Sequence, residues 1–276
     1  AACQPLEDAI FPVLRVYFEK PRTVVGWKGM INDPDLVGSF HINKGRQLAG
    51  VVLLVVAELG LAAGSEFLVT TFGQFFADLV SLGAIGARTV ESQIHREVAS
   101  GLSMPVGFKN GTNGQIDVAI DAIRSAAHSH WFPSLTKEGT PAILRSTGNP
   151  HGYLILRGGK QTGPNYGAES VQAAASALAA RELPASLIVD CSHGNSEKDP
   201  ERQAQVMSNL CEQIQTGQRA IRGIMLESHL VGGNQSIAPR ETMTYGQSIT
   251  DACLAFTATA PLLEQLAAAV RMNNAS

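Results

Sequence analysis

Short apolar segments alternate with longer amphipathic ones along this chain, which predicts an α/β fold with a parallel sheet and helices outside it. Seven apolar segments have the length of buried strands, helical periodicity fills most of the gaps between them, and polar residues follow the strands. Seven such strands in 276 residues favour a (β/α)8 TIM barrel over an open doubly wound sheet. Because a barrel needs eight strands, we expect its first strand and helix to be missing or altered.

The first expected strand, residues 13–18, is a buried apolar run that ends before Pro21, which cannot extend a central sheet. The other expected strands are 65–69, 84–87, 105–108, 153–156, 186–190 and 222–226. The expected helices are 73–82, 116–127, 169–181, 200–216 and 258–271, and the apolar run 48–57 is expected to be a buried helix. Residues 132–136 and 142–146 flank Gly139 and predict an inserted β-hairpin. Without a repeat or a linker, residues 1–276 are expected to form one catalytic domain.

The composition limits the classes of function. Apolar residues make up 45% of the chain and charged residues 16%, which supports a packed core. A net charge of -3 argues against a nucleic-acid binder. The apolar run 48–57 is too short to span a bilayer, so no membrane is expected. The four cysteines lack CxxC spacing and no signal peptide precedes the first strand, so we expect a cytoplasmic protein with reduced thiols.

Charged residues recur at the carboxyl ends of the predicted strands, where barrel enzymes build their active sites. The residues in question are Arg15, Lys20, Arg22, Glu66, Arg88, Lys109, Arg157, His193 and Glu227, with Asp251 before the last helix. Each alone has an ordinary explanation, as a surface cation, a salt-bridge partner or a core histidine. The repetition at one end of strand after strand favours a functional site.

These residues fall into two groups, one suited to binding anions and one suited to binding a metal ion. Arg15, Arg88, Lys109 and Arg157 are suited to clamping a phosphate and a carboxylate. Glycines at 86, 158 and 159 allow backbone N–H groups to approach an anion closely. The remaining set, His193, Glu227 and Asp251, offers mixed nitrogen and oxygen ligands for a divalent ion if the barrel brings its strand ends together.

Long motifs in this chain resemble those of the type I 3-deoxy-D-arabino-heptulosonate-7-phosphate (DAHP) synthases, from about residue 13 to the C-terminus. The motifs are Arg15-Val-Tyr-Phe-Glu-Lys-Pro-Arg-Thr23, Gly26-Trp-Lys-Gly29, Ile31-Asn-Asp-Pro34, Gly83-Ala-Ile-Gly-Ala-Arg88, Glu91-Ser-Gln93, Pro105-Val-Gly-Phe-Lys-Asn-Gly-Thr112, Ile155-Leu-Arg-Gly-Gly-Lys160, Asp190-Cys-Ser-His-Gly-Asn195, Glu227-Ser-His229, Gly233-Asn-Gln235 and Tyr245-Gly-Gln-Ser-Ile-Thr-Asp-Ala252. Chance does not produce so many motifs in one order.

The resemblance implies a (β/α)8 barrel that condenses phosphoenolpyruvate with erythrose 4-phosphate to DAHP and phosphate, the first step of the shikimate pathway to aromatic amino acids. It implies that Lys20 and His193 are catalytic, and that His193, Glu227 and Asp251 bind a divalent metal, with Mn2+ expected first and Fe2+, Co2+ or Zn2+ as alternatives. The implied substrate-binding residues are Arg15, Lys20, Pro21, Arg22, Thr23, Glu66, Gly86, Ala87, Arg88, Lys109 and Arg157. It also implies a homo-oligomer and an aromatic amino acid effector, whose identity the sequence leaves open.

The chain departs from the family pattern in two places. The family's fourth metal ligand, a cysteine in a Gly-Pro-Cys-Ser motif on the first barrel strand, is absent, as is the usual N-terminal segment. Cys3 is a weak substitute, because only nine residues separate it from Val13 and a parallel crossover needs a dozen or more. After Glu66 the family usually has Glu-Phe-Leu-Asp, whereas this chain has Val69 in place of the aspartate. We therefore expect weakened metal binding and turnover.

Two other functions compete with this one. A non-catalytic paralogue or fragment would keep the anion pocket and bind phosphoenolpyruvate or a partner synthase, and the missing cysteine strand favours it. A related 3-deoxy-octulosonate 8-phosphate synthase would use another sugar, but the Lys20-Pro-Arg-Thr23 motif argues for the shorter one.

Overall fold

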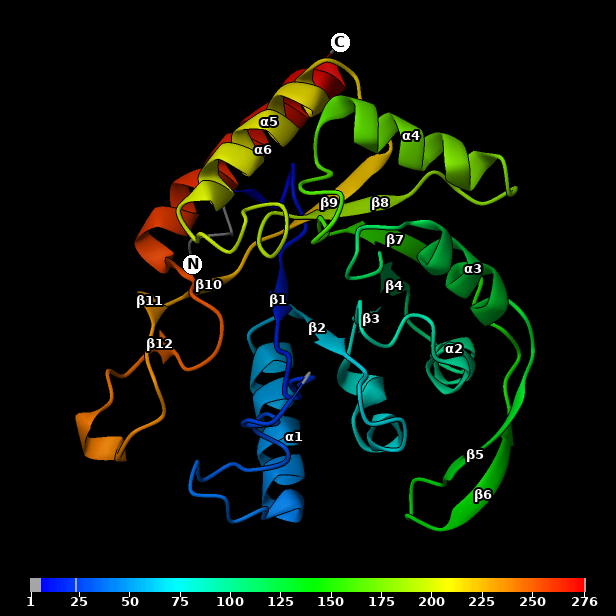
Figure 1. Ribbon diagram of the computed structural model, residues 1–276, viewed down its shortest axis with the longest axis vertical. Coiled ribbons are helices and arrows are strands. Elements are labelled where there is room, and N and C mark those ends of the chain that lie inside the picture. Colours follow the sequence, from blue (N-terminus) through cyan, green and yellow to red (C-terminus); the bar gives the residue numbers. More distant parts are fainter. Residues whose placement is uncertain (1–5, 23, 276) are drawn as a thin grey trace. The chain divides into compact units, whose positions relative to one another are not determined.

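The computed structural model describes residues 6–22 and 24–275, so Cys3 and Thr23 lie outside the described residues (Figure 1). The contacts within the chain divide it into two compact units. We call Pro12–Gly111 with Asp117–Leu154 the N-terminal unit. The C-terminal unit comprises Ala1–Phe11, Thr112–Ile116 and Ile155–Ser276. The expectation of one domain over 1–276 stays a prediction.

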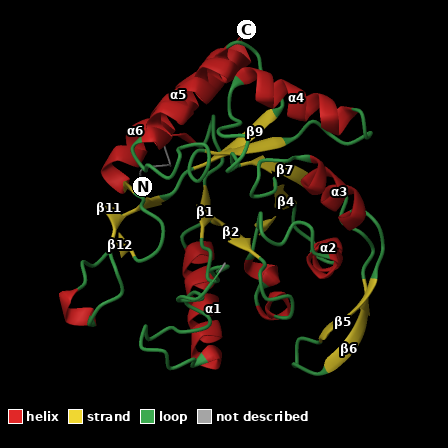
Figure 2. Cartoon of the chain, viewed as in Figure 1, coloured by secondary structure: helices red, strands yellow, loops and turns green. Residues whose placement is uncertain are grey.

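The N-terminal unit combines parallel strands with helices between them (Figure 2). Its strands are β1 (Val13–Arg15), β2 (Ala62–Glu66), β3 (Leu82–Ile85) and β4 (Val106–Lys109), its helices α1 (Ile42–Glu58), α2 (Gln93–Ser100) and α3 (Asp117–Ala126), and two 3-10 turns, η2 (Phe72–Phe75) and η3 (Ala77–Leu79), precede β3. Neighbouring strands from β1 to β4 pair in parallel, with Arg15 opposite Gly64 and Glu66 opposite Ala84. This register brings the carboxyl ends of the four strands to one edge.

The predicted hairpin is confirmed. Strands β5 (Trp131–Leu135) and β6 (Pro141–Arg145) pair antiparallel with Trp131 opposite Arg145. Gly139 turns the chain between them with φ 83°, a left-handed conformation that glycine adopts without a side-chain clash.

The C-terminal unit carries the last strands of the sheet and three helices. The elements are β8 (Leu187–Asp190), β9 (Ile221–Met225), α4 (Ala168–Ala179), α5 (Arg202–Gln215), α6 (Phe256–Ala275), the 3-10 turn η4 (Arg240–Thr242) and the short strands β10 (Ser228–His229), β11 (Val231–Asn234), β12 (Gln247–Ser248) and β13 (Leu254–Ala255). Strands β8 and β9 pair in parallel, and α5 packs along α6. The short strands form two parallel pairs, β10 with β13 and β11 with β12.

Strand β7 (Gly152–Leu156) is the point at which the chain passes from one unit to the other. The strand order is β1-β2-β3-β4-β7-β8-β9, so all seven predicted strands belong to one sheet. This arrangement confirms the predicted α/β class and is consistent with a (β/α)8 barrel.

Several predicted elements differ from the structure. The first strand ends at Arg15 rather than at residue 18, and it is only half-buried. The predicted helix 73–82 is wrong, because that segment makes two 3-10 turns and then enters β3. Helix α1 is longer than expected and only one face is buried, so Val51 and Leu54 are exposed. No helix among the described residues is both long and apolar enough to cross a membrane.

A buried asparagine joins three segments of the N-terminal unit. The side-chain amide of Asn149 donates to three backbone carbonyls, those of Ala99, Leu102 and Met104, at 3.3, 3.0 and 2.9 Å. Its oxygen accepts from the backbone N–H of His151 at 3.0 Å. Because Asn149 is 3% exposed, this network ties the end of α2 to the starts of β4 and β7 without help from water.

Candidate active site

Three predicted metal ligands meet in the C-terminal unit. One ligand atom each from His193, Glu227 and Asp251 lies within 4.8 Å of the other two. His193 follows β8, Glu227 follows β9, and Asp251 precedes β13. Parallel pairing of β8 with β9 carries the first two residues to the same end of the sheet, as the sequence predicts.

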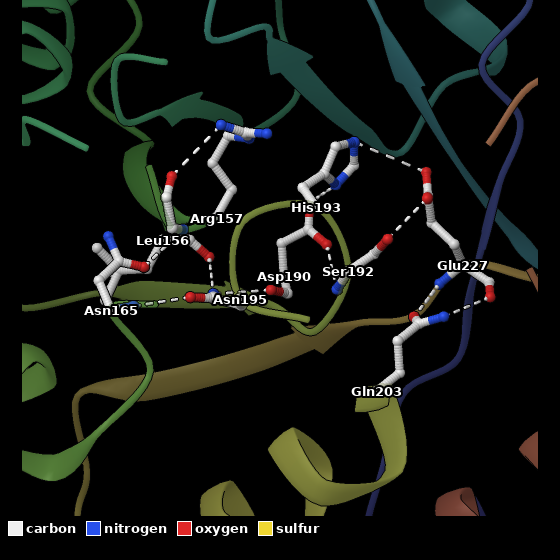
Figure 3. Close-up of polar contacts among 10 residues, drawn as sticks. Leu156, Arg157, Asn165, Asp190, Ser192, His193, Asn195, Gln203 and Glu227 are labelled. Carbon is white, nitrogen blue, oxygen red and sulfur yellow. Dashed lines mark hydrogen bonds and ion pairs between the residues drawn. The ribbon is translucent and has the colours of Figure 1, made fainter. Parts of the chain in front are cut away.

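The turn that carries His193 is held by its neighbours (Figure 3). His193 has φ 55°, in the left-handed region that few non-glycine residues occupy. Nearby, the Asn195 amide donates to the backbone oxygens of Asp190 and Leu156 at 2.8 and 3.2 Å. Asn195 in turn accepts from the backbone N–H of Asn165 at 2.8 Å. The surrounding hydrogen bonds therefore fix a backbone conformation that costs free energy by itself.

The imidazole of His193 lies against a buried acid. Its Nδ1 lies 2.9 Å from Oδ2 of the fully buried Asp190, and its Nε2 lies 3.8 Å from Oε1 of Glu227. A carboxylate at one ring nitrogen leaves the other to face a metal, which is the usual arrangement around metal-binding histidines.

Glu227 is fixed through both its backbone and its carboxylate. Gln203 of α5 accepts from the backbone N–H of Glu227 at 2.8 Å and donates to its carbonyl at 3.0 Å. The Ser192 hydroxyl donates to Glu227 Oε2 at 2.8 Å. Glu227 is 4% exposed, and burying an anion so deeply is costly unless a cation or hydrogen bonds offset the charge. One imidazole and two carboxylates fit a divalent transition metal.

His193, Glu227 and Asp251 together are called the cage from here on. Arg157 belongs to the same unit as the cage. The backbone N–H of Gly194 donates to the Arg157 carbonyl at 2.9 Å, which links the end of β7 to the turn that carries His193. Gly158 has φ 68°, and a side chain there would place its first carbon 2.5 Å from Gly194. The two loops therefore touch through their backbones, which only glycine permits at this distance.

In the N-terminal unit, two predicted cations gather around one aromatic ring. The Arg15 guanidinium lies 3.9 Å from the centroid of the Tyr17 ring, and Lys109 Nζ lies 5.4 Å from the same centroid. Lys109 ends β4 and is 4% exposed. Two positive groups at one ring repel each other, so a bound anion would stabilise this arrangement.

Glu66 and Gly86, at the ends of β2 and β3, are in close contact. A side chain at position 86 would place its first carbon 2.5 Å from Glu66 Oε1, so the buried Glu66 carboxylate would have to move to make room for it. Ala87 and the exposed Arg88 follow in the next turn. The structure thus places the predicted residues 86–88 directly after β3.

Glu19 is a buried acid that sequence reasoning missed. It is 2% exposed, and its Oε2 accepts from the backbone N–H of Val69 at 3.2 Å. Burial, with a smaller contribution from the Glu66 charge, raises the pKa of Glu19 from 4.5 to about 7. In the sequence, Glu19 is an acid within a segment that carries four cations. No pattern in that segment indicates that Glu19 is buried.

The loop after β1 carries the predicted sugar-phosphate residues. The backbone N–H of Lys20 donates to the Lys28 carbonyl at 2.9 Å, and Arg22 Nε donates to the Trp27 carbonyl at 2.7 Å. These bonds close the loop that contains Pro21. The convergence of Arg88, Lys109 and Arg157 on one ligand stays a prediction.

Comparison with known proteins identifies close relatives. A family model described as the DAHP synthetase I family matches residues 2–264. The chain is 55% identical over 258 residues to the Trp-sensitive phospho-2-dehydro-3-deoxyheptonate aldolase of Escherichia coli K12, covering 94% of this chain and 74% of that one. It is 53% identical over 268 residues to the Phe-sensitive enzyme of the same strain, covering 97% and 76%.

The fold of the chain is also similar to that of a solved structure. The phospho-2-dehydro-3-deoxyheptonate aldolase of Francisella tularensis SCHU S4 matches with a TM-score of 0.91 at 50% identity, covering 95% of this chain and 76% of that one.

The expectation of weakened activity is not borne out by these comparisons. It was drawn from the absence of a Gly-Pro-Cys-Ser motif, yet the aligned residues are more than half identical to those of curated enzymes.

Proposed function

The chain belongs to the DAHP synthetase I family, whose enzymes condense phosphoenolpyruvate with erythrose 4-phosphate, and we propose that it divides this reaction between a cation set and a metal cage. The cage of His193, Glu227 and Asp251 is the observation that carries the proposal, because three candidate ligands that are widely separated in sequence meet within 4.8 Å. The chain is thus a transferase that forms DAHP and inorganic phosphate.

The cation set binds the two anionic substrates. Arg15 and Lys109, which share the Tyr17 ring, and Arg88 offset the phosphate and carboxylate of phosphoenolpyruvate. Arg157 serves the same phosphate, while Lys20, Pro21, Arg22 and Thr23 hold the sugar phosphate. Two anions repel each other in water, so neutralising and orienting them supplies much of the rate enhancement.

The cage holds a divalent ion, Mn2+ in the first instance. When bound, such an ion supplies Lewis-acid polarisation of the aldehyde oxygen of the sugar phosphate. The chain's own contribution is to orient the ligands, since Asp190 fixes the His193 ring and Gln203 fixes the Glu227 backbone.

The condensation forms one carbon–carbon bond and releases inorganic phosphate. The enol carbon C3 of phosphoenolpyruvate attacks the aldehyde carbon, and Lys20 donates a proton to the new alkoxide. Water adds to C2 of the former enol, and loss of inorganic phosphate leaves the ketone of DAHP. The loop that carries Lys20 is closed by the hydrogen bond from its backbone N–H to the Lys28 carbonyl.

Turnover with both substrates tests the proposal directly. We expect phosphate release and heptulosonate formation in the presence of Mn2+, and loss of both after chelation. Arg88→Ala is expected to raise KM for phosphoenolpyruvate at least tenfold, whereas Arg124→Ala, an exposed cation on α3, leaves it unchanged. Binding of phosphoenolpyruvate without turnover would favour the non-catalytic paralogue instead.

An aromatic amino acid is the proposed effector, since two relatives are described as Trp-sensitive and Phe-sensitive. A hollow of about 400 Å³ in the N-terminal unit suits such a ligand. Apolar Phe132 and Leu144 line it with polar Ser134 and Arg145, which match a ring and a carboxylate. Ser134→Phe should abolish inhibition by tryptophan or phenylalanine, while Ile143→Phe on the exposed face of the same hairpin should not.

We further propose a cytoplasmic homo-oligomer, as the family resemblance implies. Light scattering on the purified chain measures the oligomeric state, and a monomer at micromolar concentration would contradict it.

A further inference from the structure

The two carboxylate oxygens of Glu227 have different partners. Oε2 accepts a hydrogen bond from the Ser192 hydroxyl at 2.8 Å, whereas Oε1 lies 3.8 Å from His193 Nε2 (Figure 3). Both side chains are buried, Ser192 at 5% and Glu227 at 4% exposure, so water does not compete for this hydrogen bond. One oxygen of the carboxylate is therefore engaged by the protein, and the other faces the cage.

Ser192 is itself held by the acid that orients His193. The backbone N–H of Ser192 donates to Asp190 Oδ1 at 3.0 Å, and Asp190 Oδ2 lies 2.9 Å from His193 Nδ1. One buried carboxylate thus fixes both the residue that engages Glu227 and the ring that faces it. The positions of two ligands depend on one network.

We propose that Ser192 is a positioning residue that determines metal specificity, by reserving one oxygen of Glu227 so that the cage offers a single oxygen from this carboxylate. This inference rests on the metal cage of the proposed function. Ca2+ takes six to eight oxygen ligands and often binds a carboxylate through both oxygens. When Ser192 engages Oε2, only Oε1 of Glu227 is available to a metal. We expect this to disfavour Ca2+ relative to Mn2+, which accepts mixed nitrogen and oxygen ligands.

The hydroxyl can be removed without releasing the loops around it. Asn195 holds the turn through the backbone oxygens of Asp190 and Leu156, and Gln203 holds the backbone of Glu227. None of these bonds involves the Ser192 hydroxyl. Ser192→Ala is therefore expected to remove the hydrogen bond to the Glu227 carboxylate and to leave these other hydrogen bonds in place.

Ser196 provides a matched control in the same loop. It is fully buried, and its hydroxyl has no hydrogen-bond partner among the described residues. Ser196→Ala thus makes the same chemical change without losing a hydrogen bond. Ser192→Thr keeps a hydroxyl at the position and forms the second test variant.

The experiment titrates Mn2+ into the full chain and each variant, following free Mn2+ by electron paramagnetic resonance, and repeats this with Ca2+ as competitor. We expect Ser192→Ala to bind Mn2+ about tenfold more weakly and to lose at least tenfold of its preference for Mn2+ over Ca2+. Ser196→Ala and Ser192→Thr should keep the affinity and preference of the unaltered chain.

Three results would overturn the inference. A Ser192→Ala chain with the same Mn2+ preference as Ser196→Ala would show that the hydroxyl does not set specificity, while leaving the cage itself in place. Equal losses in Ser192→Thr and Ser192→Ala would show that the hydroxyl is not the cause. Absence of Mn2+ binding by the unaltered chain would remove the cage, and the inference with it.

Discussion

The buried acid Glu19 makes the stability of this protein depend on pH. Its pKa is raised from 4.5 to about 7 in the folded chain, chiefly by burial, so the folded state binds more protons than the unfolded state between these values. Stability therefore falls as the pH rises through this window. The gap between the two pKa values corresponds to about 3 kcal/mol, most of which is lost between pH 5 and pH 8.

Replacing Glu19 by glutamine removes the titration and keeps the side-chain shape. The amide oxygen can still accept from the backbone N–H of Val69. Relative to the unaltered chain, we expect Glu19→Gln to gain about 2.5 kcal/mol of unfolding free energy when the pH rises from 5 to 8. Urea unfolding followed by circular dichroism at several pH values measures this difference.

Glu241→Gln is the matched control, because this glutamate is exposed in the η4 turn. Its effect should stay within about 0.5 kcal/mol at every pH. If the difference between Glu19→Gln and the unaltered chain were constant from pH 5 to 8, the acid would be ionised throughout and the reasoning from burial would be refuted. A difference of opposite sign would indicate a cation paired with it.

Three further predictions concern packing, hydrogen bonding and thiol reactivity. Gly86→Ala should destabilise the chain by about 1–3 kcal/mol, because the new methyl group would meet Glu66 Oε1 at 2.5 Å; an unchanged urea midpoint would contradict this contact. Asn149→Ala should cost about 2–3 kcal/mol, since it leaves buried backbone groups unsatisfied; a loss below about 0.5 kcal/mol would argue against the network. Burial raises the pKa of the Cys191 thiol, whereas Cys253 is partly exposed, so iodoacetamide should label Cys253 before Cys191. Peptide mapping measures the order, and faster labelling of Cys191 would show that its site opens.

The sequence predicted the strands better than the segments between them. All seven strands were located from short apolar runs of strand length, although β1 is only half-buried. The start of β2 was missed by three residues, since Ala62, Ala63 and Gly64 have little strand propensity and are held by pairing with β1. The segment 73–82 was assigned to a helix because its apolar residues recur at helical spacing, yet it makes 3-10 turns.

The ligands of the candidate site were predictable, and the residues that support them were not. His193, Glu227 and Asp251 follow or precede strands in recognisable motifs, and the structure brings them together. Ser192 and Gln203 are common polar residues whose importance appears only when their partners are known. A glutamine in the first turn of a helix carries no sign in the sequence that it bonds the backbone of a residue 24 positions away.

The left-handed backbone of His193 makes the turn after β8 costly to form by itself. A glycine there would adopt φ 55° without strain, but His193→Gly would also remove the imidazole that lies 2.9 Å from the fully buried carboxylate of Asp190. Relieving the backbone strain at this position would therefore remove a side-chain contact with a buried acid.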